Sequence, residues 1–254
     1  MTDVPPPASA APPPPAEAVD VFGAQLPLAQ RYADLLATTG IAHGLVGPRE
    51  APRLWERHLV NCAVMESLLP AGETVIDIGS GAGLPGLVLA VARPDLSVHL
   101  VEPLLRRTNW LHGTIEQLGL DNVVVHRGRA EEVDLSAPVV TARAVASLDK
   151  LIRWSFPLLT PGGRLLALKG GSAQEELDGV APLLRRAGVE VSTVHLVGEG
   201  RVSEPVRVVE IVRPAQVADP ARPDGRGSGG GRRARGSGHR RGGRRRAGSS
   251  RDDA

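Results

Sequence analysis

The chain has 254 residues, a net charge of +2 and 42% hydrophobic residues, which is enough for one α/β domain with flanking segments. Its single cysteine, Cys62, excludes an internal disulfide framework and a cysteine-rich zinc site, and it fits a reducing compartment. Neither an apolar run of about eighteen residues nor a signal-peptide pattern is present. We therefore expect a cytoplasmic protein without a membrane span.

The two ends of the chain differ in composition from the middle. Residues 1–22 are rich in proline and alanine, and we expect a disordered leader because proline lacks a backbone donor. Residues 215–254 are predicted to form a disordered tail, and residues 221–254 hold eleven Arg against three Asp, a local charge of +8. This tail either binds nucleic-acid phosphates or only solubilises the protein. Subtracting +8 from the total of +2 leaves −6 for residues 1–220.

Residues 23–70 are predicted to form helices. An apolar stripe that contains Tyr32 recurs at helical spacing as far as Gly40, where we expect the helix to stop. A second stripe ends before Pro70. It contains Cys62, for which we expect a buried core role.

In residues 71–214, short apolar runs alternate with amphipathic segments. One such segment is Leu104–Leu118, a predicted helix that ends at Gly119. This alternation is typical of a doubly wound, mostly parallel sheet. No helix separates the last two strands, so we expect an antiparallel pair at one edge. The seven expected strands are Val75–Ile78, Val98–Val101, Val123–Val125, Val139–Thr141, Leu165–Leu168, Val191–Leu196 and Val206–Val212.

The densest motif is VIDIGSGAGLPG at residues 75–86, an apolar strand that ends in an acid before a glycine-rich turn. Gly79, Gly81 and Gly83 allow backbone conformations that are closed to other residues. In doubly wound sheets such a turn binds nucleotides. Residues 81–86 also match the dinucleotide pattern G-x-G-x-x-G, so a nicotinamide cofactor is one alternative.

Acidic residues at successive strand ends favour S-adenosylmethionine over a diphosphate nucleotide. Asp77 precedes the glycines and suits a cationic ligand, and Glu102 ends the second strand, where it can accept hydrogen bonds from ribose hydroxyls. Ala130 and Glu131 follow the third strand, where a backbone amide and an acid can meet an adenine. Each acid alone could be structural, but three strand ends that converge on one nucleoside favour this cofactor.

The run DIGSGAGLPG at residues 77–86 resembles the RsmG family, also named glucose-inhibited division protein B, whose members are 16S ribosomal RNA guanine-N7 methyltransferases. Further matching segments are RH at 57–58, Glu102 with RR at 106–107, RAEE at 129–132, ARAVASL at 142–148 and ALKG at 167–170. The resemblance covers about residues 24–213. It implies a class I S-adenosylmethionine-dependent methyltransferase fold, α/β and Rossmann-like with seven strands, and an N-terminal helical extension.

The resemblance also implies transfer of a methyl group from S-adenosylmethionine to N7 of one guanine in the decoding region of 16S rRNA, either as naked RNA or in the 30S subunit. Carried over, Gly79 and Leu84 contact the cofactor, Ala130 and Glu131 frame the adenine, and Arg143 stands at the methyl-transfer crevice. Members often have Asn-Leu-Thr where this chain has GLV at residues 44–46, so an RNA contact by that Asn is not carried over.

The residue types are compatible with attack by N7, whose lone pair already lies in the ring plane. No base is needed, and the enzyme must mainly orient two reactants. Arg143 can orient a guanine through O6 or a phosphate, although a structural ion pair is the alternative. The further candidates for RNA contact, each of which could instead lie on a solvated or structural surface, are Arg53, Arg57, His58, Arg106, Arg107 and Lys169.

Two other functions remain open at this point. One is a methyltransferase of the same fold that acts on a small molecule, and the other is an RNA-binding assembly protein that works through its basic tail. The seven histidines show no metal-ligand spacing, so we expect no metal site, and we expect a monomer.

Overall fold

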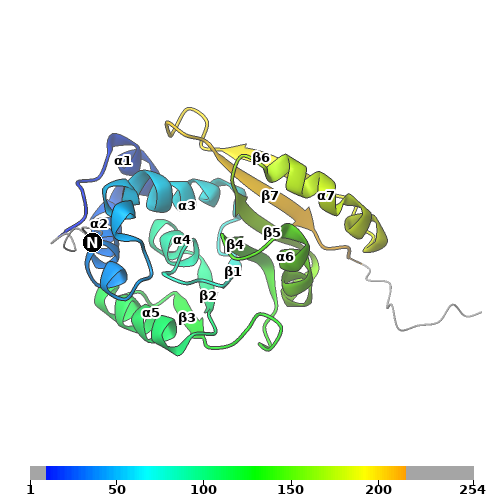
Figure 1. Cartoon of the computed structure of the whole chain (residues 1–254), viewed down its shortest axis with the longest axis horizontal. Helices are drawn as coiled ribbons and strands as arrows, with labels where there is room; N and C mark the ends of the chain where they lie inside the picture. Colours follow the sequence, from blue (N-terminus) through cyan, green and yellow to red (C-terminus); the bar gives the residue numbers. More distant parts are fainter. Residues whose placement is uncertain (1–9, 216–254) are drawn as a thin grey trace, which may run out of the picture. The chain divides into compact units, whose positions relative to one another are not determined.

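The computed structural model describes residues 10–215, in which seven strands form one sheet flanked by helices (Figure 1). The strands are β1 (Thr74–Ile78), β2 (Ser97–Val101), β3 (Val123–His126), β4 (Ala137–Arg143), β5 (Leu159–Lys169), β6 (Ser192–Val197) and β7 (Val206–Val212). The α-helices are α1 (Ala16–Phe22), α2 (Leu26–Leu35), α3 (Asn61–Ala63), α4 (Gly86–Ala92), α5 (Leu105–Leu118), α6 (Leu148–Ser155) and α7 (Ala173–Arg186). Short 3-10 or π turns are η1 (Gly23–Gln25), η2 (Leu36–Gly40), η3 (Pro48–Arg53), η4 (Trp55–Val60), η5 (Val64–Leu68) and η6 (Phe156–Leu158).

The sheet has the strand order β3-β2-β1-β4-β5-β7-β6 and confirms the predicted doubly wound architecture. Strands β1 to β5 pair in parallel, whereas β7 runs antiparallel to both β5 and β6. The expected antiparallel pair therefore forms one edge of the sheet, with β6 outermost. The strand order reverses between β1 and β4, and sheets of this kind bind ligands at the carboxyl ends of the strands beside such a reversal.

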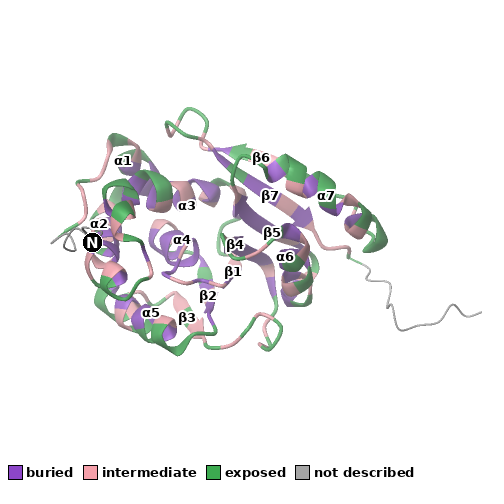
Figure 2. Ribbon diagram, in the orientation of Figure 1, coloured by how far each residue is buried: buried purple, intermediate pink, exposed green. Residues whose placement is uncertain are grey.

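Alternate residues of each strand enter two different cores, one on each face of the sheet. Val75 belongs to the core formed with α4, α5 and the N-terminal helices, whereas Ile76 belongs to the core formed with α6 and α7. Leu166 and Leu165 divide in the same way. Helix α4 is buried along almost its whole length because the N-terminal helices cover it (Figure 2). Those helices and one face of the sheet thus share one hydrophobic core.

The N-terminal segment differs from the expected disordered leader. Residues 16–22 form α1, in which Val21 and Phe22 are buried. The Phe22 ring meets the Trp55 indole edge-on, with centroids 6.1 Å apart, and the indole N–H donates to the Pro12 carbonyl at 2.8 Å. The prediction of disorder is therefore wrong for residues 16–22, because the proline-rich composition concealed a short apolar face that other helices cover.

The first long helical segment also differs from its prediction, since it does not stop at Gly40. The chain continues through the π turn η2 to Ala42, and Gly40 is buried. A Cβ atom at Gly40 would lie 3.6 Å from the ring of Trp110 on α5. Gly40 therefore serves close helix packing, and the turn comes at Gly44, where φ is +65°.

The helix predicted over Leu104–Leu118 is confirmed as α5. Gly119 follows it in the left-handed conformation, with φ of 69°, and its N–H bonds back to the carbonyl of Glu116. The first residues of α5 lie at the carboxyl end of β2, so this helix begins beside the reversal of strand order.

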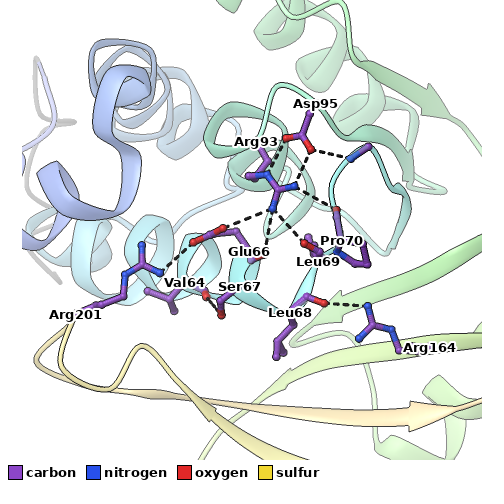
Figure 3. A network of polar contacts seen from close by, with 11 residues as sticks. Val64, Glu66, Ser67, Leu68, Leu69, Pro70, Arg93, Asp95, Arg164 and Arg201 are labelled. Atoms are coloured by element: carbon purple, nitrogen blue, oxygen red, sulfur yellow. Dashed lines mark hydrogen bonds and ion pairs between the residues drawn. The ribbon is translucent and has the colours of Figure 1, made fainter.

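A polar network connects η5 with the approach to β1 and with the loop between β6 and β7 (Figure 3). Glu66 accepts a hydrogen bond from Arg201 at 3.0 Å and pairs with Arg93 at 3.6 Å. Arg93 also bonds Asp95 at 2.7 Å and the Leu69 carbonyl at 3.2 Å. These contacts fix the segment that leads into the strand carrying the glycine motif.

Residues 1–9 and 216–254 lie outside the described part of the chain, and nearly all of the predicted basic tail falls there. Among residues 10–215, no helix is long and apolar enough to cross a membrane.

Candidate functional site

A cavity of about 640 Å³ opens at the carboxyl ends of the parallel strands, and its volume suits a nucleoside-sized ligand. The predicted cofactor residues that line it are Gly79, Gly81, Leu84, Glu102, Ala130, Glu131 and Arg143. Two of the predicted RNA contacts, His58 and Arg107, line it as well. The structure therefore brings together residues from four strand ends and from the N-terminal helical segment.

The loop between β1 and α4 turns at three glycines with positive φ: +69° at Gly79, +57° at Gly81 and +86° at Gly83. A Cβ atom at Gly79 would lie 2.8 Å from the Val145 methyl groups, and one at Gly83 would lie 2.5 Å from the Leu87 side chain. Gly83 thus packs against the core and does not line the cavity. Both positions require glycine for conformation and for space.

Six backbone N–H groups of this loop are already engaged within the chain. The amides of Gly79 and Ser80 both donate to the Val101 carbonyl, and the amide of Gly81 donates to Glu102 Oε2. The amides of Gly83 and Leu84 both donate to the Ser80 carbonyl, and the amide of Gly86 donates to Asp77 Oδ2. The donor–acceptor distances are 2.7–3.2 Å. A diphosphate site at such a turn needs free backbone donors that point at the anion. Here these six donors already bond carboxylate and carbonyl oxygens of the chain, so they are not free to bind the oxygens of a diphosphate.

Asp77 lies behind the loop and not on the cavity wall. Its side chain is fully buried, and Oδ2 accepts a hydrogen bond from the Gly86 amide at 3.1 Å. Its Oδ1 atom has no hydrogen-bond partner among the described residues. Burial raises the pKa of this carboxyl to about 7. The sequence placed Asp77 against the ligand, whereas the structure places it where it holds the first turn of α4.

Gly86 permits this arrangement and was not singled out from the sequence. A Cβ atom there would lie 2.3 Å from a Leu100 methyl and 2.8 Å from Asp77 Oδ2. The glycine therefore lets α4 start directly against the Asp77 carboxylate. Gly86 could have been found from the sequence, because it is the last residue of the glycine-rich motif.

Glu102 is also buried, with 1% of its surface exposed, but it does line the cavity. Oε2 accepts hydrogen bonds from the Gly81 amide at 3.0 Å and from Arg107 at 3.4 Å, and Oε1 accepts from the Leu104 amide at 3.0 Å. These donors hold the carboxylate in one orientation on the wall. Its oxygens still have lone pairs that can accept hydrogen bonds from hydroxyl groups.

Arg143 ends β4 on the opposite side of the cavity. Its Nη2 atom donates to the Arg57 carbonyl at 2.9 Å and lies 2.8 Å from Nδ1 of His58, while Nη1 donates to Cys62 Sγ at 3.4 Å. Cys62 is fully buried, as predicted, and burial raises the pKa of its thiol. The guanidinium is thus fixed by the helical segment that contains these three residues.

The loop after β4 completes this side of the cavity. Ala144 has a positive φ of 54°, a conformation that is uncommon for residues other than glycine and clusters at functional sites. Lys169 supports the loop from β5, because its Nζ donates to the Ala146 carbonyl at 3.0 Å and pairs with Glu176 at 2.7 Å. Trp154 of α6 also lines the cavity, although its position in the sequence gave no such signal.

The remaining predicted RNA contacts do not line the cavity. Arg53 pairs with Glu56, and Arg57 pairs with Glu50 at 3.1 Å. Arg106 is exposed on α5 and borders a separate groove, whereas Lys169 has only 11% of its side chain exposed.

Comparison with known proteins identifies the family. Residues 25–204 match the family GidB, described as rRNA small subunit methyltransferase G. The chain belongs to this family.

Curated members of the GidB family are similar to this chain over most of their length. A protein of Thermobifida fusca named "Ribosomal RNA small subunit methyltransferase G" is 60% identical over 194 residues, covering 76% of this chain and 82% of that protein. A protein of the same name from Streptomyces coelicolor is 57% identical over 196 residues with the same coverage. Among solved structures, a SAM-dependent methyltransferase from Aquifex aeolicus is 19% identical, with a TM-score of 0.47 over 69% of this chain and 97% of that chain.

Proposed function

We propose that this protein transfers a methyl group from S-adenosylmethionine to N7 of a guanine in 16S ribosomal RNA. The observation that carries the proposal is the polarity of the loop after β1. Its amides are held by Asp77, Glu102 and main-chain carbonyls, and the Glu102 carboxylate lines the cavity where a diphosphate would need donors. A cationic nucleoside fits this arrangement and a dinucleotide does not.

The residues around the cavity fit S-adenosylmethionine, as three strand ends supply complementary groups. The buried Glu102 carboxylate can accept hydrogen bonds from the two ribose hydroxyls, and Ala130 with Glu131 can meet the adenine. Asp77, with an unpartnered oxygen at the base of the loop, adds negative charge when it is ionised. When bound, the cofactor supplies a sulfonium methyl group, which is electrophilic.

The side chains near β4 would hold the acceptor. Arg143 can donate to guanine O6 or to a phosphate, and Trp154 offers an aromatic face at the cavity wall. Neither residue needs to remove a proton, because N7 attacks with a lone pair that is already free. Catalysis would then come from orientation of two bound reactants in a partly closed cavity. The name shared by the relatives supports the choice of small-subunit rRNA as acceptor.

The decisive experiment compares 16S rRNA from a strain that has this gene with 16S rRNA from its deletion strain. Mass mapping should show loss of one N7-methylguanine in the deletion strain and its return on complementation. The purified protein should bind S-adenosylmethionine in calorimetry and show no binding of NADH. Unchanged 16S modification together with S-adenosylmethionine binding would replace the proposed acceptor by a small molecule, and NADH binding would overturn the cofactor assignment.

A matched pair of variants tests the cofactor site. Gly81→Arg should abolish binding of S-adenosylmethionine, because its side chain would enter the cavity that Gly81 lines. A Cβ atom at Gly81 meets no atom closer than 3.8 Å, so the variant should still fold, with some loss of stability from the φ of +57°. Gly200→Arg, at a position that also has a positive φ (+73°) and open space around it but lies outside the cavity lining, is the matched control. Equal binding by the two variants would refute the site.

A further inference from the structure

Resting on the function proposed above, we infer that Glu50 and His58 are positioning residues that hold the Arg143 guanidinium toward the methyl acceptor. The three side chains form one line, with His58 Nε2 3.2 Å from Glu50 Oε2 and His58 Nδ1 2.8 Å from Arg143 Nη2. His58 and Arg143 both line the cavity, whereas Glu50 stands behind them. The sequence suggested His58 as an RNA contact or as a structural residue, without a link to Arg143.

The hydrogen-bonding state of His58 follows from its two neighbours. A guanidinium has donors and no acceptor, so Nδ1 must accept from Arg143. In a neutral imidazole the other nitrogen carries the hydrogen, so Nε2 donates to Glu50. The ring therefore has one tautomer and one orientation, and a carboxylate fixes it.

Electrostatics favour this neutral form. Burial, together with the charges of Arg143 and Arg57, lowers the pKa of His58 to about 4, although Glu50 opposes this shift. Only 14% of the side chain is exposed. His58 thus stays an acceptor for Arg143 at neutral pH, and a protonated ring would repel the guanidinium.

The remaining contacts of Arg143 show why its orientation matters. One hydrogen of Nη2 goes to the Arg57 carbonyl and one hydrogen of Nη1 goes to Cys62. Three of the five guanidinium donors are therefore engaged with the helical segment, which leaves two for a substrate. Without His58, the Arg143 guanidinium keeps only two acceptors, the Arg57 carbonyl and the weakly accepting Cys62 sulfur. Its orientation toward the cavity is then less well fixed.

Histidine titration by NMR tests the contacts without any assay of methylation. In the full chain, Arg143→Met should raise the pKa of His58 by about 1 unit or more, because the neighbouring positive charge is gone, and Glu50→Gln should lower it. His112→Phe, which removes an exposed histidine of α5, is the control and should leave the titration of His58 unchanged. A pKa of His58 that is the same in the wild type, Arg143→Met and Glu50→Gln would overturn the network.

A double-mutant cycle tests the consequence for methylation. His58→Phe should lower kcat about 10- to 100-fold and leave the affinity for S-adenosylmethionine within about twofold, because a misplaced orienting group affects the reaction more than cofactor binding. In the Arg143→Met background the same change should have less than about a twofold further effect. Independent, multiplying losses would show that His58 does not act through Arg143.

Glu50→Gln provides the second variant if His58→Phe does not fold, and it should lower kcat less than His58→Phe does. The titration result also separates this inference from the proposed function. If the NMR shifts are as expected but 16S rRNA is not methylated, the network exists and the acceptor is wrong. If methylation is present and the shifts are absent, the positioning role is wrong.

Discussion

The two sides of the cavity are built in different ways. On the β1–β2 side, the glycine loop donates backbone N–H groups to the carboxylates of Asp77 and Glu102, which lie within 25 residues of it. On the β4 side, the Arg143 guanidinium is held by residues 81 to 86 positions earlier in the chain, through the Arg57 carbonyl and the Cys62 side chain. The first side is thus a local structure, whereas the second exists only once the N-terminal helices have packed on the sheet.

This difference explains why the two sides respond to different changes. A substitution at a loop glycine that packs against buried side chains, such as Gly83 or Gly86, should damage cofactor binding and folding together. A substitution on the β4 side should change methyl transfer while cofactor binding persists. Four variants measure that contrast.

Gly86→Ala should have the largest effect. The added methyl group would collide with Leu100 and with the Asp77 carboxylate, both of which are buried. We expect a loss of about 3 kcal/mol in the free energy of unfolding, in line with overpacked cores, and a loss of S-adenosylmethionine binding. Urea denaturation and calorimetry measure the two effects. A stable variant with normal cofactor affinity would contradict the close packing of α4 on Asp77.

Asp77→Asn should change how stability depends on pH. Because burial raises the pKa of the folded carboxyl to about 7, the stability that this group contributes is complete below its unfolded pKa and is lost as the pH rises through about 7. Relative to Asp77→Asn, the wild type should therefore lose at least about 1 kcal/mol between pH 4 and pH 7.5. Urea denaturation of both proteins across this range gives the difference, in which the titration of His58 cancels. Parallel curves would show that Asp77 is not protonated in the fold.

Lys169→Gln tests the β4 side with a smaller effect. The change removes the ion pair with Glu176 and the hydrogen bond to Ala146, so the loop after Arg143 loses support. We expect methyl transfer to slow about three- to tenfold, while the Kd for S-adenosylmethionine stays within about twofold. Lys150→Gln, at the only other lysine and an exposed one, is the matched control. A weaker cofactor affinity in Lys169→Gln would mean that the two sides are not separable.

Gly113→Ala should have the smallest effect and the opposite sign. Gly113 lies inside α5, and nothing lies within 4 Å of the position that a Cβ atom would take. Alanine in a helix interior is favoured over glycine by about 0.5–1 kcal/mol, so the variant should unfold at a higher urea concentration. Destabilisation would show that α5 packs more closely than described.

The same contrast sets how much could be predicted from the sequence. Strand positions, the sheet topology and the glycine turn follow from local patterns of period and composition, and the structure confirms the strands and the antiparallel edge. Glu102 and Ala130 were found because they follow strands, and strand ends of a parallel sheet share one edge. The contacts of Arg143 with His58 and Cys62 could not be predicted, because they depend on where a distant helical segment lies.

Two local features differ from what the sequence led us to expect, and in both the cause is packing. Because glycine has a low helix propensity, Gly40 was expected to end a helix. Its packing against Trp110 outweighs the cost of glycine within a helix. Asp77 was assigned to the ligand because of its place before the glycines, but the burial of α4 draws its carboxylate to Gly86.

The contacts of residues 12–22 with the rest of the fold have a practical consequence for the choice of expression boundaries. The family match covers residues 25–204, yet residues before it make contacts with the rest of the fold. Phe22 packs on Trp55, and the Pro12 carbonyl accepts a hydrogen bond from the Trp55 indole. Glu17 accepts a hydrogen bond at 2.6 Å from the amide of Ser203, on the loop between β6 and β7. A fragment that begins at residue 25 would leave an aromatic surface open to solvent and would release that loop, and one that also ends at residue 204 would lose β7. Expression from residue 10 or earlier keeps these contacts, so the boundary of similarity is not the boundary of the folding unit.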